Sequence, residues 1–92
     1  MKWTDVTSYS RSDKERKPTS WQLDAGPLAV TVVFNHRDRP GEWCFHCYDL
    51  GMDTESLPGV STEQEAKSKA LTVIGLRLSR LLDTLSLMQQ AS

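Results

Sequence analysis

The sequence lacks the hydrophobic run that a membrane-spanning helix requires. Such a helix needs roughly 20 consecutive apolar residues, and even the apolar stretch from Leu71 to Leu76 is interrupted by Thr72 and Gly75. Residues 1–5 also lack the apolar segment and the small-residue cleavage site of a signal peptide. We therefore expect a cytoplasmic protein that makes no membrane contact.

The sequence also has little net charge and few cysteines. Eleven Lys and Arg residues against twelve Asp and Glu residues leave a net charge of −1, so bulk charge indicates neither a nucleic-acid binder nor an acidic mimic. Two cysteines three residues apart do not make a disulfide framework, and we expect reduced thiols. A chain of 92 residues with 38% apolar residues is predicted to form one domain over residues 1–92.

Motifs of the common enzyme classes are missing. The sequence contains no Gly-x-Ser-x-Gly nucleophile elbow, no phosphate loop and no dinucleotide fingerprint. Glu63 and Glu65 form a pair of carboxylates, but they fall in the first turn of a predicted helix, where the helix dipole favours negative charge. We therefore predict no catalysis, no cofactor and no small-molecule substrate.

The segment Cys44-Phe45-His46-Cys47 is the candidate for metal chemistry. A zinc site needs four converging ligands, and His36 is the fourth candidate beside Cys44, His46 and Cys47. Residues three apart in a regular strand point to opposite faces, so the two cysteines cannot share a metal without a bulge or a turn. We predict a buried Cys47, a Cys44 without a role and no metal site; a metal-dependent module is the third alternative.

The spacing of apolar residues changes near residue 60. Before it, apolar residues alternate, which predicts strands at about residues 2–9, 19–25, 28–34 and 42–50. Polar segments at residues 11–18 and 35–41 are predicted loops, and residues 51–59 an irregular connection. In the last strand Phe45 and Cys47 are predicted to share one face, and Cys44 and His46 the other.

The C-terminal third is predicted to be one amphipathic helix over residues 62–89. Capping boxes begin at both Ser61 and Thr62, so either residue is a candidate N-cap. The helix would be about 40 Å long, roughly twice the length of a strand of six or seven residues. Its last two or three turns should therefore extend past the sheet. The apolar residues predicted to share one side of this helix are Ala70, Leu71, Ile74, Leu78, Leu81, Leu82, Leu85 and Met88.

These elements predict an α+β domain in which an antiparallel meander of three to four strands packs on one long C-terminal helix. The outward face of this sheet carries small or apolar residues where a solvated face should be polar. Surplus apolar surface is typical of a binding site, so we predict a protein partner or self-association, for example as a homodimer. The predicted contact residues are Val33, His46 and Tyr48 on the sheet and Leu76, Leu87 and Met88 on the helix.

Nucleic-acid binding is the alternative function. The two loops at one end of the predicted sheet carry six basic residues, although acidic residues are interleaved with them, which is typical of a solvated loop. An accessory nucleic-acid-binding role is therefore the alternative that the sequence does not favour. The basic residues are Arg11, Lys14, Arg16, Lys17, Arg37 and Arg39.

Two motifs carry a resemblance to known proteins. Pro40-Gly41-Glu42-Trp43 in a hairpin, followed by a helix that opens with residues 61–67 (Ser-Thr-Glu-Gln-Glu-Ala-Lys), resembles small phage- or prophage-encoded proteins of unknown function. Residues 28–82 are more distantly similar to the sheet-and-helix part of HicB-type antitoxins, through Asp49-Leu50-Gly51 and residues 62–66. The first resemblance implies a binding role directed at a host or phage component, and neither implies particular site residues.

Overall fold

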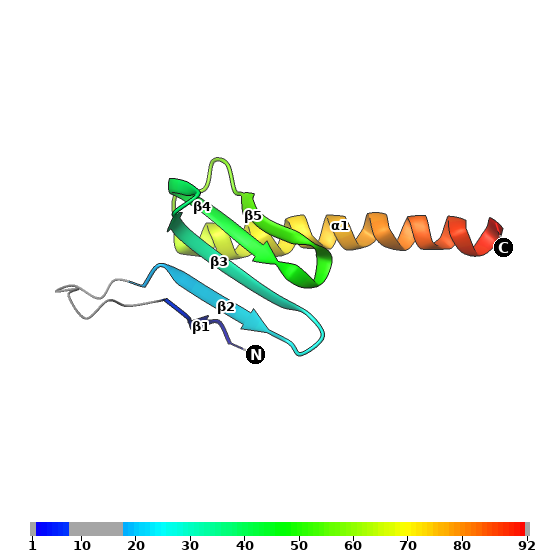
Figure 1. The fold of residues 1–92 in the computed structure, drawn as a ribbon, viewed down its shortest axis with the longest axis horizontal. Helices are drawn as coiled ribbons and strands as arrows, with labels where there is room; N and C mark the ends of the chain where they lie inside the picture. The colour runs from blue at the N-terminus through cyan, green and yellow to red at the C-terminus, as the bar shows by residue number, and fades with distance from the viewer. Residues whose placement is uncertain (1, 8–17, 92) are drawn as a thin grey trace.

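The computed structural model describes residues 2–7 and 18–91 as a five-stranded antiparallel sheet with one long helix (Figure 1). The strands form a meander in chain order, which confirms the predicted α+β class. A 3₁₀ turn, η1, separates the last two strands. The elements are β1 (Thr4–Asp5), β2 (Ser20–Asp24), β3 (Ala29–His36), β4 (Arg39–Cys47), η1 (Tyr48–Leu50), β5 (Met52–Ser56) and α1 (Glu63–Ala91).

The fifth strand corrects the prediction of an irregular connection over residues 51–59. β5 pairs with β4, but the register shifts between Phe45 and Cys47, and Thr54 has a left-handed φ of 50°. This bulge breaks the alternation of β5, which is why its sequence does not show a strand pattern. Residues 8–9 of the predicted first strand, and loop residues 11–17, lie outside the described residues.

The β3–β4 hairpin is also longer than predicted. The predicted loop over residues 35–41 is mostly strand, because β3 and β4 continue until His36 pairs with Arg39 around a tight turn. Asn35 has a φ of 61° and lies at a register shift. Asn tolerates this conformation better than most residues, and the bulge places the His36 ring beside His46, with ring centroids 5.5 Å apart.

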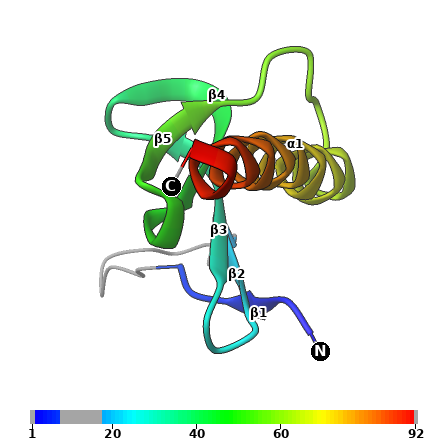
Figure 2. The same ribbon diagram turned by 90° about the vertical axis from the view of Figure 1, so that its right-hand side faces the viewer.

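The core lies between α1 and one face of β3 and β4 (Figure 2). Val32 pairs with Phe45 across these strands, and both side chains are fully buried. From α1 only Ala66, Ala70 and Ile74 are buried. The two alanines permit a close approach of helix and sheet, so the helix is anchored by its N-terminal half.

Aromatic side chains cover the part of this face that α1 leaves open beside β1 and β2. The Trp21 and Trp43 rings stack with centroids 5.8 Å apart, and Phe34 packs 5.1 Å from Trp43. Lys67 on α1 places its Nζ atom 5.4 Å from the Trp3 ring and 5.3 Å from the Trp21 ring. These cation–π contacts connect the helix to the outer strands.

The N-terminus of α1 is fixed by Thr62, one of the two predicted caps. The Glu65 amide donates to Thr62 Oγ1 at 3.2 Å, whereas Ser61 makes only a 3.5 Å bond to the Glu65 carboxylate. We expect Thr62→Ala to lower the free energy of unfolding by about 1 kcal/mol, because a helix amide loses its acceptor. Urea denaturation measures this loss, and the control Ser61→Ala should have a smaller effect. Equal losses would contradict the assignment of Thr62 as the cap.

Candidate interaction surface

The C-terminal half of α1 extends beyond the sheet. A helix of 29 residues is about 44 Å long, and the molecule measures 59 Å along its longest axis but only 28 and 21 Å along the others. Figure 1 shows the second half of α1 projecting past the strands. Every residue from Ser79 to Ala91 is exposed. We call these thirteen residues the overhang.

The overhang continues the apolar face that α1 uses against its own sheet. Leu78, Leu81, Leu85 and Met88 follow one another at intervals of three, four and three residues, which keeps them on the side of the helix that buries Ile74. Leu78 still packs at the edge of the core. Beyond it, Leu81, Leu85 and Met88 are 43%, 47% and 64% exposed. Leu82 lies at one side of these three residues. We call the four exposed residues Leu81, Leu82, Leu85 and Met88 the apolar stripe.

Two of the predicted helix residues lie away from this stripe. At 100° per residue, Leu76 and Leu87 share one side of α1, which lies opposite to Ile74 and about 100–120° around the helix from Met88. Both leucines are about two-thirds exposed. Leu76 lines a shallow hollow with Met52, Val73, Arg77 and Arg80, where β5 begins beside the helix. The predicted set Leu76, Leu87 and Met88 therefore does not form one patch.

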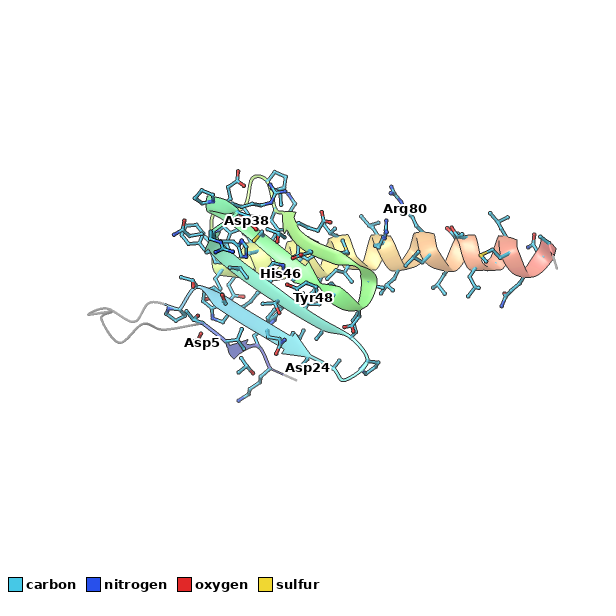
Figure 3. All side chains as sticks on the ribbon, viewed as in Figure 1. Asp5, Asp24, Asp38, His46, Tyr48 and Arg80 are labelled. Atoms are coloured by element: carbon cyan, nitrogen blue, oxygen red, sulfur yellow. The ribbon has the colours of Figure 1, made fainter. Side chains whose placement is uncertain are left out.

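The predicted sheet residues lie on the face opposite to α1. Val33 is half-buried, and Tyr48 is exposed and stacks on His46 with ring centroids 5.4 Å apart. His46 itself is only 7% exposed, so it offers little surface to a partner. Tyr48, predicted to lie on a strand, is in η1 directly after β4. Figure 3 shows it and His46 far from Arg80 on the helix. The six predicted contact residues are thus divided among three separate places.

A hydrogen-bonded group that the sequence did not reveal surrounds His46. The Thr54 amide donates to His46 Nδ1 at 2.9 Å, and Asp53 Oδ1 lies 3.0 Å from the same nitrogen. The Thr54 hydroxyl also donates to Asp53 Oδ1 at 2.9 Å. The hydrogen bond from the Thr54 hydroxyl holds the pKa of Asp53 below its ordinary value, and the nearby His46 lowers this pKa to a smaller extent. The bulge at Thr54 makes these contacts possible, and a bulge has no clear sequence signal.

The lowered pKa of Asp53 predicts an acid-dependent loss of stability. The native carboxyl binds its proton less readily than the unfolded one, so its contribution is present above about pH 4 and is lost as pH falls through the native pKa. We expect the free energy of unfolding of Asp53→Asn to depend less on pH in this range than that of the wild type. Urea titrations between pH 2 and pH 6 measure both curves, and parallel curves would contradict the role of Asp53.

The two cysteines lie on opposite faces of β4, as the strand pattern predicts. Cys47 belongs to the core beside α1, whereas Cys44 pairs with Val33 and Ser56 on the other face. They therefore cannot bind one metal ion together, and no cluster of metal-ligating residues occurs within residues 2–7 and 18–91. Cys44, predicted to have no role, is as completely buried as Cys47, since β3 and β5 flank it on both sides.

Burial raises the pKa of both thiols, which should make them unreactive. We expect iodoacetamide at pH 8 to alkylate Cys44 and Cys47 at least about 100-fold more slowly in native protein than in denaturant, because reaction requires unfolding. Mass spectrometry of the adducts measures both rates. A Ser68→Cys variant, with its new thiol on an exposed position of α1, supplies the fast-reacting control. Rapid alkylation of either native thiol without denaturant would contradict their burial.

The structure describes only two of the six basic residues considered for nucleic-acid binding. Arg37 is exposed at the β3–β4 turn. The Arg39 guanidinium is engaged within the sheet, where Nε donates to the Thr54 carbonyl at 2.8 Å and Nη1 lies 3.8 Å from Glu42. Arg11, Lys14, Arg16 and Lys17 lie outside the described residues. Nucleic-acid binding therefore stays a prediction from the sequence.

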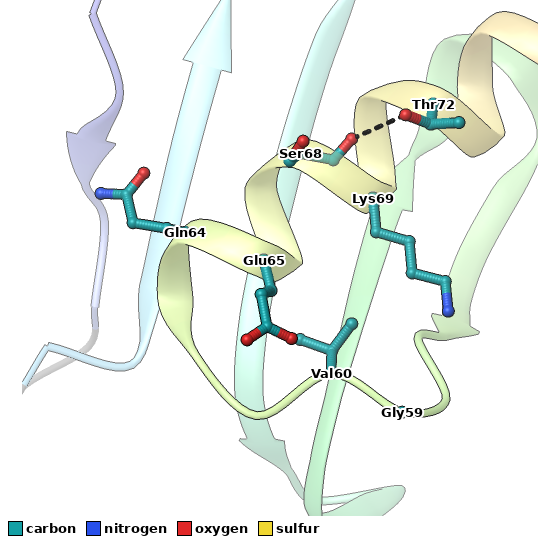
Figure 4. A pocket seen from close by; sticks show the side chains of 7 residues that line it. All are labelled: Gly59, Val60, Gln64, Glu65, Ser68, Lys69 and Thr72. Carbon is teal, nitrogen blue, oxygen red and sulfur yellow. Dashed lines mark hydrogen bonds between the residues drawn. The ribbon is translucent and has the colours of Figure 1, made fainter.

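An open hollow lies beside the first turns of α1, and two of its polar side chains, Lys69 and Thr72, are already hydrogen-bonded to the chain (Figure 4). Lys69 Nζ donates to the Pro58 carbonyl at 2.6 Å, and the Thr72 hydroxyl donates to the Ser68 carbonyl at 3.1 Å. A small-molecule site needs convergent polar groups directed at the ligand. These groups are directed at the chain itself, so the apolar stripe is the stronger candidate site.

Comparison with known proteins adds no family to these observations: no protein-family model, no curated protein and no solved structure matches the chain. The resemblances to phage-encoded proteins and to HicB-type antitoxins therefore stay predictions. Within residues 2–7 and 18–91, no helix is both long enough and apolar enough to cross a lipid bilayer.

Proposed function

We propose that this protein is a small non-enzymatic binding protein and that it acts through protein–protein contacts made by the overhang. One observation carries the proposal: the apolar face of α1 continues for about three turns beyond the sheet that it covers. Burying a large aliphatic side chain stabilises a protein by about 1.5–3 kcal/mol. Side chains that stay in water do not gain this energy. A partner that covers them recovers this energy.

The overhang also needs a partner to hold its own conformation. Short helices without tertiary contacts are marginal in water, and the thirteen residues of the overhang are all exposed. An apolar groove or a second amphipathic helix would both bury the stripe and hold these turns in helical form. The polar residues on other sides of the overhang, such as Ser79, Asp83 and Ser86, would stay in water.

Affinity capture with matched variants tests this proposal. Leu81→Glu with Leu85→Glu places two charges in the stripe, and Ser79→Glu with Ser86→Glu places the same two charges on another side of the same turns. From extracts of cells that naturally produce the protein, we expect the wild type and the serine control to capture the same proteins. The leucine variant should lose at least one of them. Identical capture by all three proteins would overturn the proposal.

A further inference from the structure

The apolar stripe has the residue spacing of a helix–helix seam. Intervals of three and four residues, as in Leu78, Leu81, Leu85 and Met88, are the a and d positions of a heptad, which present apolar side chains to another helix. Leu82 widens this seam on one side. After Asp83 the overhang carries no charged residue, and Arg80 and Asp83 lie on other sides of the helix.

From this seam we infer that the partner of the overhang is a second copy of this chain, with the two overhangs packed antiparallel. The inference rests on the proposed function and names the partner for the same surface. The two identical stripes are self-complementary, as a two-fold interface requires. In the antiparallel arrangement centred near Leu85, Leu81 of each protomer faces Met88 of the other.

The position of the sheet selects the antiparallel direction. The stripe lies on the side of α1 that faces the sheet, so a helix packed on it occupies the same layer as the sheet, just beyond the strands. A parallel partner would have to run its N-terminal half through the space that β3 and β4 fill. An antiparallel partner inserts only its overhang there, and its own sheet then lies beyond Ala91.

The buried area is sufficient for a specific dimer. Burying one large aliphatic side chain removes about 60–120 Å² from water, so the four side chains of the apolar stripe from each of two overhangs supply roughly 480–960 Å² of apolar surface. Apolar atoms form about 65% of a homodimer interface, which places the total near 740–1,480 Å². This range overlaps the roughly 1,200–2,000 Å² of stable interfaces.

Sedimentation equilibrium tests the stoichiometry. Between about 1 and 500 μM, we expect the wild type and the control Ser79→Glu with Ser86→Glu to form a dimer, and Leu81→Glu with Leu85→Glu to dissociate at least about 100-fold more readily. All four positions, the two substituted leucines and the two control serines, are exposed, and circular dichroism checks that each variant is folded. A wild type that is monomeric throughout, or a dimer unaffected by the leucine substitutions, would overturn the inference.

Spin labels on Ser68→Cys test the direction, because the native cysteines are buried. The antiparallel dimer separates the two labels by about 50 Å, given a rise of 1.5 Å per residue on both sides of Leu85. A distance under about 30 Å would overturn the antiparallel arrangement. If the protein is monomeric but the leucine variant still loses captured proteins, self-association fails while the proposed function stands.

Discussion

A Phe45→Ala variant should lose most of the stability of the fold. Phe45 is fully buried near the C-terminal end of β4, where it pairs with Val32 on β3 and Glu55 on β5. Removing a buried phenylalanine costs about 3–5 kcal/mol, because burial is lost and a cavity remains. A domain of this size has a total stability of roughly 5–14 kcal/mol. Urea denaturation followed by tryptophan fluorescence measures the loss.

Phe34→Ala is the matched control for this prediction. The substitution is the same, but Phe34 is 37% exposed and packs mainly on the Trp43 ring at the end of β3. We expect a loss of about half that of Phe45→Ala or less, because much less surface returns to water. Equal losses at the two positions would mean that the core does not lie between β3, β4 and α1.

Ile74→Ala should cost about 2–4 kcal/mol, while Leu85→Ala in dilute protein should change stability by less than about 0.5 kcal/mol. Both residues lie on the same face of α1, but Ile74 is 3% exposed and Leu85 is 47% exposed. Ile74 belongs to the core cluster, and Leu85 lies in the overhang, the part of α1 that projects past the strands. Chemical denaturation at concentrations below dimerisation measures both values.

The difference in stability loss between Ile74→Ala and Leu85→Ala distinguishes the folded core from the docking surface. If Leu85→Ala destabilised the dilute protein as much as Ile74→Ala, the stripe would be part of the folded core. The overhang would then stabilise the fold of its own chain, and its apolar side chains would no longer indicate a partner. A small effect of Ile74→Ala would instead contradict the packing of α1 on β3 and β4.

Elements with a regular period could be predicted from the sequence. The spacing of Ala70, Ile74 and Leu78 predicts a helix longer than the strands, and the cap at Thr62 marks its start. The alternation through β4 correctly assigns Phe45 and Cys47 to one face and Cys44 to the other. These features depend on local periodicity, which a sequence displays directly.

Features that depend on bulges and neighbouring strands could not be predicted. The bulge at Thr54 hides β5 and creates the contacts of Asp53 with His46, and the bulge at Asn35 moves His36 beside that histidine. Burial of Cys44 and His46 follows from strands on both sides of β4. The predicted helix contacts Leu76 and Leu87 lie on another side of α1 than the apolar stripe, whose exposure beyond Leu78 follows from where the sheet ends and not from the helical period.

Hydrogen exchange of the α1 amides is the most direct test of the claim that the overhang depends on a partner. In dilute protein, we expect slow exchange over residues 66–78, which pack on the sheet, and fast exchange over residues 79–91, which are all exposed and extend past the sheet. Raising the protein concentration should slow exchange in residues 79–91 alone. Equal protection of both segments in the dilute protein would contradict the account.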